Sequence, residues 1–314
     1  MQTVVLAIGG NSLITDKEHQ TVPDQYQACA QTCAHIAQML QEHDRRLVVT
    51  HGNGPQVGFI LRRAELALNE LHMVPLDSCV ADTQGALGYH IQRALQNEFK
   101  RRKIPKTAVT VVTQVLVDKD DPSFKKPNKP IGSFMSQEAA QKHRLEDRWD
   151  VVEDAGRGWR RVVASPVPKK ILELDTIRGL AEAGTVVVAV GGGGIPVVAD
   201  ERGALIGAAA VIDKDLASSL LARQIKADLL IISTAVEKVF LDFGKPTQRA
   251  VERMTTTEAK RYMAEGHFQA GSMLPKVRAV IEFLEAGGSE AIITNPANLE
   301  AAVAGRAGTH VVCG

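Results

Sequence analysis

Three lysines in this chain follow stiff or glycine-bearing turns, from which a charged side chain can be held toward an anion. Lys129 lies between prolines, Lys214 precedes Asp215 in the run Val-Ile-Asp-Lys-Asp, and Lys276 ends the run Gly-Ser-Met-Leu-Pro-Lys. A single lysine is usually a solvated surface charge, and Asp213 or Asp215 alone would most often be a helix N-cap. Lysines that meet at one place would instead favour an anionic ligand, so the combination needs a further test.

Three glycine clusters each follow an apolar run that predicts a strand. They are Gly9-Gly10-Asn11, Gly52-Asn53-Gly54 and Gly191-Gly192-Gly193-Gly194. In open parallel sheets, ligands bind beyond the carboxyl ends of the strands, where glycine lets backbone N–H groups approach an anion. Any one cluster could be merely a tight turn. Three clusters in equivalent positions predict one shared anion site.

Neither common nucleotide-binding signature is present in the sequence. No glycine loop ends in Gly-Lys-Ser/Thr, and none reads Gly-x-Gly-x-x-Gly at a strand-to-helix turn. His51 and His90 each stand alone, without neighbours at metal-ligand spacing, so we expect no metal held by the protein itself. The cysteines are too few for a disulfide framework, and we expect buried or incidental thiols at Cys29, Cys33, Cys79 and Cys313.

The elements that must position these residues alternate along the chain. Short Val- and Ile-rich runs between stretches of helical periodicity predict an α/β fold, a three-layer α/β/α sandwich around a mainly parallel open sheet. The predicted strands are residues 4–8, 47–50, 108–117, 185–190, 229–233, 291–294 and 311–312. Helical spacing covers residues 24–43 and 57–72, and the Ser-Pro-Val-Pro run at 165–168 predicts the start of another helix.

One stretch breaks this alternation. Residues 118–165 are rich in charge and proline and contain both tryptophans. A loop of this length inside a compact domain is usually a functional lid or a small subdomain. We therefore predict a single domain over residues 1–314, with residues 118–165 protruding from it as a lid.

The composition excludes several functional classes. With 37 Lys+Arg against 36 Asp+Glu, the formal charge is +1, so no overall positive field favours nucleic acid or an anionic membrane. No apolar stretch approaches the ~20 residues of a membrane span. No cationic segment precedes residues 4–8, unlike a secretory signal, so we expect a cytoplasmic protein.

Taken together, these motifs resemble the carbamate kinases of the amino-acid-kinase family over nearly the whole chain. The matching segments follow in the family's order and are the first two glycine loops and residues 120–132, 165–168, 191–196, 211–215, 243–246 and 271–276. General amino-acid kinases usually carry a lysine just before the first glycine pair. Ala7 stands at that position here, as in carbamate kinases, where a subdomain lysine approaches the substrate instead.

The resemblance implies reversible phosphoryl transfer between carbamoyl phosphate and ADP, giving ATP and carbamate. Lys214 and Lys276 would contact the phosphates, Asp215 would orient these lysines, and Lys129 would close over carbamoyl phosphate. The implied substrate cradle is Gly9, Gly10, Asn11, Gly52, Asn53, Gly54, Gly191, Gly192 and Gly193. No general base is required, because the carbamate oxygen is already anionic. Mg²⁺ would be bound mostly through the nucleotide's phosphates, and a homodimer is expected.

The nucleotide is expected over the C-terminal half of the chain. The residues implied for its base are Thr234, Ala235, Val236, Val239, Phe240, Ser272 and Met273. Apolar residues at these positions could equally be strand core. Small departures from the family pattern occur at Ser12, Ala86 and Leu87, and Asp242 replaces the usual asparagine.

Two alternative functions therefore stay open. The chain could phosphorylate another small carboxylate or use another acyl phosphate, as other amino-acid kinases do. It could also be a ligand-binding paralogue that has lost turnover. Formation of ATP from ADP and carbamoyl phosphate in a coupled assay would separate the three hypotheses.

Overall fold

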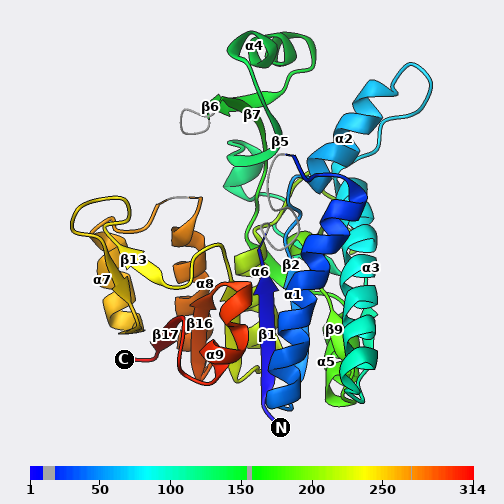
Figure 1. Cartoon of the computed structure of the whole chain (residues 1–314). Helices are drawn as coiled ribbons and strands as arrows, with labels where there is room; N and C mark the ends of the chain where they lie inside the picture. Colours follow the sequence, from blue (N-terminus) through cyan, green and yellow to red (C-terminus); the bar gives the residue numbers. More distant parts are fainter. Residues whose placement is uncertain (10–17, 154–157, 270) are drawn as a thin grey trace.

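An eight-stranded sheet forms the centre of the structure, a computed structural model that describes residues 1–9, 18–153, 158–269 and 271–314 (Figure 1). In spatial order its strands are β15 (Arg253–Thr255), β17 (Thr309–Val312), β16 (Glu290–Thr294), β12 (Leu229–Ser233), β1 (Thr3–Ile8), β2 (Arg46–His51), β9 (Val186–Val188) and β3 (Ala108–Thr110). The β16–β17 pair is antiparallel and the other neighbours are parallel. The predicted α/β class with a mainly parallel sheet is confirmed.

The central strand β1 shows why the sheet must be covered on both faces. Its residues Val4, Leu6 and Ile8 pack into one core, whereas Val5 and Ala7 pack into another, and all five are fully buried. Successive side chains of a strand point to opposite faces. A continuous apolar run therefore requires an apolar layer on each side.

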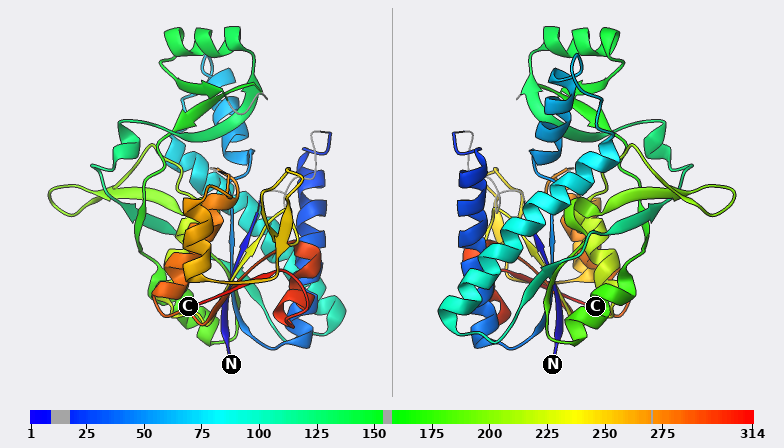
Figure 2. Two further views of the ribbon diagram at one scale, coloured as in Figure 1. Left: turned by 90° about the vertical axis from the view of Figure 1, so that its left-hand side faces the viewer. Right: turned by 90° about the vertical axis from the view of Figure 1, so that its right-hand side faces the viewer.

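Helices form these two layers (Figure 2). One face is covered by α1 (Val22–Glu42), α3 (Leu76–Arg102) and α9 (Leu299–Val303), and the other by α5 (Leu174–Glu182), α6 (Lys214–Gln224) and α8 (Met273–Glu285). The remaining helices are α2 (Gln56–Leu66), α4 (Gln137–Glu146) and α7 (Thr256–Ala264), with short 3-10 helices η2 (Pro122–Phe124), η3 (Gly191–Gly193) and η4 (Pro296–Asn298). Helix α1 begins with a capping box between Thr21 and Asp24.

Helix α2 ends earlier than the predicted helix over residues 57–72. Residues beyond Leu66 form turns, and Leu66, Leu68 and Leu71 are exposed. Apolar spacing continues there, but no surface packs against it. Because most helical stability in proteins comes from tertiary packing, the helix stops.

The prediction of one strand over residues 108–117 is wrong. Strand β3 belongs to the main sheet, whereas β4 (Gln114–Val117) pairs with β10 (Ile195–Ala199) in a second sheet. The order in this sheet is β11-β10-β4-β8, with β11 at Leu205–Gly207 and β8 at Pro168–Ile171. Between them, Gln84 accepts a hydrogen bond from the Thr113 N–H (2.8 Å) and donates to the carbonyl oxygens of Thr113 (3.0 Å) and Gly191 (2.9 Å). These bonds replace the ladder where the chain changes sheets.

The prediction of a helix start at residues 165–168 is also wrong. Pro168 opens strand β8 (Pro168–Ile171), and α5 begins only at Leu174. Strand β8 lies at the edge of the second sheet, antiparallel to β4. Proline is tolerated at the first residue of an edge strand, where its missing N–H costs no ladder bond.

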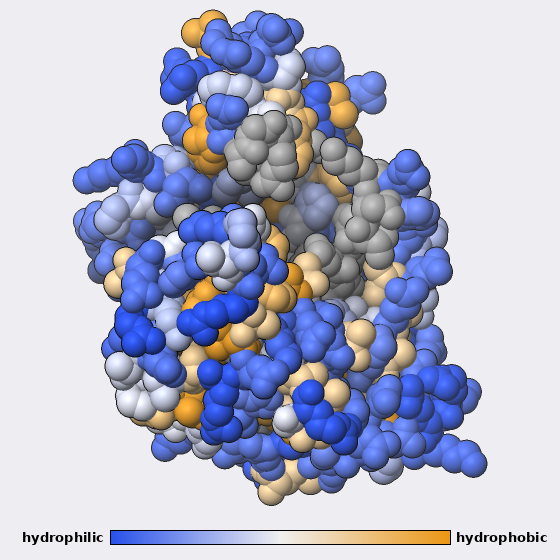
Figure 3. Space-filling model, turned by 60° about the vertical axis from the view of Figure 1, so that its left-hand side comes forward, coloured by the Kyte–Doolittle hydropathy of each residue, from blue (hydrophilic) through white to orange (hydrophobic). Residues whose placement is uncertain are grey.

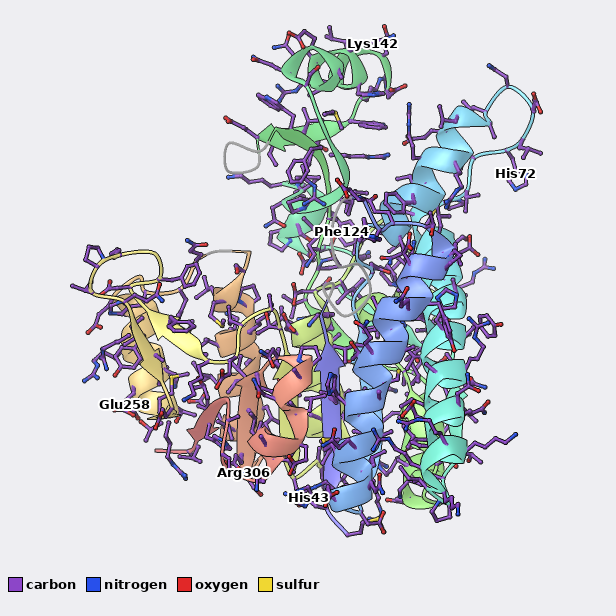
Figure 4. The ribbon with its side chains drawn as sticks, viewed as in Figure 1. His43, His72, Phe124, Lys142, Glu258 and Arg306 are labelled. Carbon is purple, nitrogen blue, oxygen red and sulfur yellow. The ribbon has the colours of Figure 1, made fainter. Side chains whose placement is uncertain are left out.

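Residues 118–165 contain a small sheet and a helix of their own. Strand β7 (Trp159–Val163) pairs antiparallel with both β5 (Lys129–Met135) and β6 (Asp150–Glu153), and α4 lies between β5 and β6 in the chain. These elements stand away from the main sheet in Figure 1. Figure 4 places Lys142 of α4 at one end of the molecule and His43, just after α1, at the other, with Phe124 near the base of the protruding part.

Among the described residues, no helix is both long and apolar enough to cross a membrane. Figure 3 shows a mostly hydrophilic face, with apolar side chains in small groups and a recess between the protruding part and the main body.

Of the cysteines, Cys313 is exposed and Cys29, Cys33 and Cys79 are buried, all as free thiols.

Candidate active site

A cavity of about 200 Å³ lies beyond the carboxyl ends of the central strands and brings together residues from distant parts of the chain. It is lined by Gly52, Asn53, Gly54, Val57, Lys129, Pro130, Ile131, Gly192, Val211, Ile212, Asp213, Lys214, Asp215, Gly271, Ser272, Pro275 and Lys276. All three lysines singled out from the sequence are present. The cavity therefore combines three cations, two carboxylates and two of the glycine clusters.

Asp215 joins two of these lysines from different helices. Lys214, the first residue of α6, donates to Asp215 Oδ1 at 2.5 Å, and Lys276, in the first turn of α8, donates to Oδ2 at 3.2 Å. The Asp215 carboxylate is almost completely buried, with 4% of its side chain exposed. Both carboxylate oxygens are therefore occupied by lysine, and the two ammonium groups are held at one side of the cavity.

The charge of Asp215 is maintained by its partners. Burial by itself would raise the pKa of this carboxyl, but the positive charges and hydrogen bonds of Lys214 and Lys276 outweigh burial and lower the pKa to about 2. The carboxylate is therefore ionised at neutral pH. It offsets the mutual repulsion of the two ammonium groups.

Lys129 forms a separate ion pair in the same cavity. Its Nζ donates to Asp213 Oδ2 at 2.6 Å, and this contact joins residues that are 84 positions apart. The other oxygen of Asp213 accepts hydrogen bonds from the N–H groups of Asp215 (2.9 Å) and Leu216 (3.3 Å). An N-cap was expected at Asp213 or Asp215, and the structure has it at Asp213, whose bond to Lys129 was not predicted.

Two helices, α6 and α8, begin at the cavity, and their N-terminal ends differ. The N-terminus of α6 is already capped by the Asp213 carboxylate. Helix α8 begins at Met273, and Pro275 is accommodated in its first turn. Its N-cap residue Ser272 makes no side-chain cap bond. The Leu274 N–H of α8 donates to the Gln269 carbonyl oxygen at 3.2 Å. Among the described residues, an anion at α8 would therefore meet no capping carboxylate, in contrast to α6.

The glycine clusters contribute unequally to the cavity wall. Gly192 has a left-handed φ of 69°, and a Cβ there would lie 2.2 Å from Asn53 Oδ1, so this position requires glycine. Asn53 donates to the Gly192 carbonyl oxygen at 2.9 Å, which ties two clusters together. Gly191 and Gly193 are buried and do not line the cavity, and Gly9 packs near the Ser233 carbonyl oxygen. The predicted Gly10 and Asn11, and the departure at Ser12, lie outside the described residues.

Buried polar residues beneath the cavity were missed by the sequence reasoning. Thr50 and Ser218 hydroxyls lie 2.6 Å apart, and Ser218 donates to the Lys214 carbonyl oxygen at 2.6 Å. These bonds fix the start of α6 to the end of β2. The neighbouring His51 is fully buried, and burial, together with the positive charge of Lys214, lowers its pKa to about 4. His51 is therefore neutral at pH 7 and adds no charge to the site.

A second pocket of about 120 Å³ adjoins the first at Ser272, which lines both. Its lining residues are Thr234, Ala235, Val236, Phe240, Phe243, His267, Gln269, Ser272 and Met273. Six of the seven residues expected near the base are among them. Val239 is not, because its side chain is buried in strand β13 (Val239–Leu241), paired with β14 (Arg249–Val251). Phe243, His267 and Gln269 were not predicted, although Phe243 belongs to a matched family segment.

Two larger cavities, of about 320 and 670 Å³, lie between α2 and residues 118–165. Both are lined by Glu65, Arg161 and Trp149. Arg161 donates to Glu65 at 3.0 Å and lies over the Trp149 ring at 4.5 Å, so its charge is already satisfied. The small cavity with three lysines is better suited to an anionic substrate than these larger, more apolar spaces.

Comparison with known proteins identifies the family of this chain. Residues 2–295 match the Amino acid kinase family. The chain is 52% identical to the carbamate kinase-like protein YahI of Escherichia coli (strain K12) and 45% identical to the carbamate kinase of Thermococcus kodakarensis, each alignment covering 99% of both chains. The solved carbamate kinase of Giardia lamblia bound to AMP-PNP has a TM-score of 0.92 at 38% identity, covering 100% of this chain and 99% of that chain. The chain therefore belongs to the amino acid kinase family, and its similarity to carbamate kinases extends over its whole length.

Proposed function

We propose that this chain is a carbamate kinase, which transfers a phosphoryl group reversibly between carbamoyl phosphate and ADP to give ATP and carbamate. The principal observation is the cavity in which Lys129, Lys214 and Lys276 meet. Ser272 joins this cavity to a pocket with aromatic walls. One ligand can thus place its phosphates among the lysines and its base in the adjoining pocket.

The roles of Lys214 and Lys276 follow from charge. Phosphoryl transfer requires in-line positioning and neutralisation of the transferred group rather than covalent participation by the protein. A unit-charge contact at about 4 Å contributes up to ~4 kcal/mol at an effective dielectric near 20. Asp215 holds both ammonium groups in place through its two oxygens. No general base is needed, because the attacking carbamate oxygen is already anionic.

Residues 118–165 act in this proposal as a lid that brings Lys129 to carbamoyl phosphate. Lys129 begins strand β5, whose neighbours β7 and β6 belong to the same stretch. The Lys129 ammonium group nevertheless lines the cavity of the main body. A movement of this stretch would therefore add or remove one positive charge at the site.

The adjoining pocket takes the adenine of the nucleotide. Phe240 and Phe243 have ring centroids 6.1 Å apart and supply flat apolar surface for a base. Ser272 and Met273 stand where this pocket meets the start of α8. The Giardia lamblia relative was solved with AMP-PNP, which supports an adenine nucleotide as the ligand.

Mg²⁺ is proposed as a companion of the nucleotide. Among the described residues, no group of three or more His, Cys, Asp or Glu side chains could hold a metal ion. The cavity carboxylates, Asp213 and Asp215, are both bonded to lysines. The nucleotide's own phosphates are therefore the ligands we propose for Mg²⁺, which would neutralise part of their charge.

The family resemblance also favours a homodimer acting in the cytoplasm, where adenine nucleotides are available. These are proposals about assembly and location rather than about the site. Light scattering on the purified protein tests the first, with twice the chain mass of 33.9 kDa expected. Fractionation of cells that produce the protein tests the second.

A coupled assay tests the function itself. Purified protein, ADP, Mg²⁺ and carbamoyl phosphate should give ATP, detected through hexokinase and glucose-6-phosphate dehydrogenase. Acetyl phosphate in place of carbamoyl phosphate tests whether another acyl phosphate is the donor. Nucleotide binding without turnover of either donor would indicate a ligand-binding paralogue instead.

A further inference from the structure

Asp213 forms hydrogen bonds with two different parts of the molecule at once. Its Oδ1 accepts from two backbone N–H groups at the start of α6, and its Oδ2 accepts from Lys129 Nζ at 2.6 Å. The first pair of bonds fixes the carboxylate to the body. The lysine partner belongs to strand β5 of residues 118–165. Inside the cavity, Asp213 thus connects the main body to the protruding residues 118–165.

In the Lys129–Asp213 ion pair, Asp213 neutralises the positive charge that an anionic substrate would bind. Three lysines and two aspartates line the cavity, and both aspartates are bonded to lysine. Lys129 is therefore already neutralised when no substrate is present. An anion that binds Lys129 must take the place of the Asp213 carboxylate oxygen.

We propose that Asp213 is a positioning residue, whose carboxylate holds Lys129 over the cavity. When carbamoyl phosphate binds, its phosphoryl group replaces the Asp213 carboxylate as the partner of Lys129. This inference rests on the proposed function, and it adds a competition between substrate and protein for one lysine. Part of the binding energy of carbamoyl phosphate is then consumed in breaking the ion pair. Asp213 therefore lowers the apparent affinity for carbamoyl phosphate, while it keeps Lys129 in position.

The partial exposure of the pair supports an exchangeable contact. The Lys129 and Asp213 side chains are 31% and 19% exposed, so water and salt reach the pair. An ion pair of this kind contributes about 1 kcal/mol, which corresponds to about fivefold in an equilibrium constant. A substrate oxyanion that contacts lysine in the same place can therefore replace the carboxylate.

The Asp213→Asn variant tests this proposal, because asparagine retains a cap oxygen for α6 and loses the charge that binds Lys129. The KM for carbamoyl phosphate should fall about five- to tenfold, with kcat changed by less than about threefold and the KM for ADP by less than about twofold. The inhibition constant for inorganic phosphate, competing with carbamoyl phosphate, should fall by the same factor. An unchanged or raised KM for carbamoyl phosphate overturns the proposal.

Two further variants separate the ion pair from a general effect of charge. Asp200→Asn removes a carboxylate that also accepts two backbone hydrogen bonds, from Arg202 (2.8 Å) and Ala204 (2.7 Å), and lines neither pocket, so it should leave all three constants unchanged. In a Lys129→Met background, adding Asp213→Asn should change phosphate affinity by less than about twofold. An equal gain in affinity with and without Lys129 would show that Asp213 acts only through its charge, and would overturn the proposal.

Phosphate binding measured by calorimetry keeps this test independent of the proposed function. If the wild-type protein forms no ATP from carbamoyl phosphate and ADP, the proposed function fails. Calorimetry still compares phosphate affinity in wild-type and Asp213→Asn protein without turnover. Tighter binding by the variant supports the competition for Lys129, and equal binding excludes it.

Discussion

Two lysine–aspartate groups line the same cavity but are held in different ways. Asp215 is 4% exposed in its side chain and binds two lysines that both come from helices of the main body. Asp213 is 19% exposed and binds one lysine, which comes from residues 118–165. Breaking the ion pairs of a buried carboxylate with two cations is costly, whereas a single, partly exposed ion pair readily exchanges its partner. One side of the site is therefore fixed before substrate binds, and the other side can adjust.

The fixed side should show the largest effects on turnover. Lys214→Ala and Lys276→Ala should each lower kcat by ~100- to 1000-fold, because these charges act chiefly on the transferred phosphoryl group. Asp215→Asn should lower kcat by ~100-fold, since the two ammonium groups then repel each other without a counter-charge. Initial rates of ATP formation at saturating substrates measure each effect.

A lysine that lines neither pocket of the site provides the control for these variants. Lys238 pairs with the exposed Glu252 at 3.0 Å, away from the cavity lining, so Lys238→Ala should retain turnover. Circular dichroism should show that each variant is folded. Near-normal kcat in the folded Lys214, Lys276 and Asp215 variants would remove the distinction between the two sides.

Acid should destabilise the fixed side through His51. The pKa of His51 is lowered from 6.5 to about 4 in the folded protein, mainly by burial. As the pH falls below 6.5, the unfolded chain binds a proton that the folded protein excludes, so the free energy of unfolding falls. The loss should reach about 2–3 kcal/mol by pH 4.5.

Urea unfolding at pH 7.5 and pH 4.5 measures this loss. His51→Asn should lose about 2 kcal/mol less than the wild-type protein between these two conditions, because asparagine does not titrate. Other buried histidines, such as His90, shift in the same direction and are common to both proteins. An equal pH dependence in both proteins would show that His51 is not the group responsible.

The adjustable side should affect substrate affinity more than nucleotide affinity. Lys129→Ala should raise the KM for carbamoyl phosphate by roughly 30-fold and change the KM for ADP by less than about threefold. The reason is that Lys129 lines the lysine cavity and not the adjoining pocket. Large and equal losses of both affinities would place Lys129 in the nucleotide site.

The contact between α2 and β5 should have the smallest effect on catalysis. A Cβ on Gly58 of α2 would lie 2.3 Å from Gly132 Cα, three residues after Lys129. Gly58→Ala should therefore displace β5 and lower kcat/KM for carbamoyl phosphate by about tenfold. Gly85→Ala in α3, with no atom within 4 Å of the new Cβ, should leave the rate unchanged. Equal rates in both variants would show that β5 tolerates the displacement.

The central strands were predictable because their pattern is local. In β1 and β12 every interior residue is apolar, and the structure buries all of them in the middle of the sheet. The break within residues 108–117 was not predictable, since those residues are equally apolar on both sides of it. The change of sheet depends on the Gln84 side chain, which comes from a helix distant in sequence.

The residues of the site were predictable to the extent that their types and spacing pointed to phosphate. Lys129, Lys214, Asp215 and Lys276 do line one cavity, although their catalytic roles stay predictions. The bond between Asp213 and Lys129 has no sequence signal, because it depends on how residues 118–165 fold back over α6. His267 and Gln269 also have no sequence signal, because neither follows a recognisable motif.

The missing side-chain cap of α8 has a consequence for how ligand binding would be observed. At α6 the protein's own carboxylate satisfies the first N–H groups, whereas Ser272 makes no such bond at α8. The Leu274 N–H at this end donates to the Gln269 carbonyl oxygen (3.2 Å), so a nucleotide phosphate would add to this bond and stabilise the first turn further. Hydrogen exchange should therefore slow in the first turn of α8 when ADP is added, and stay unchanged in the first turn of α6. The hydrogen-exchange rate in the first turn of α8 would then report nucleotide binding without any measurement of catalysis.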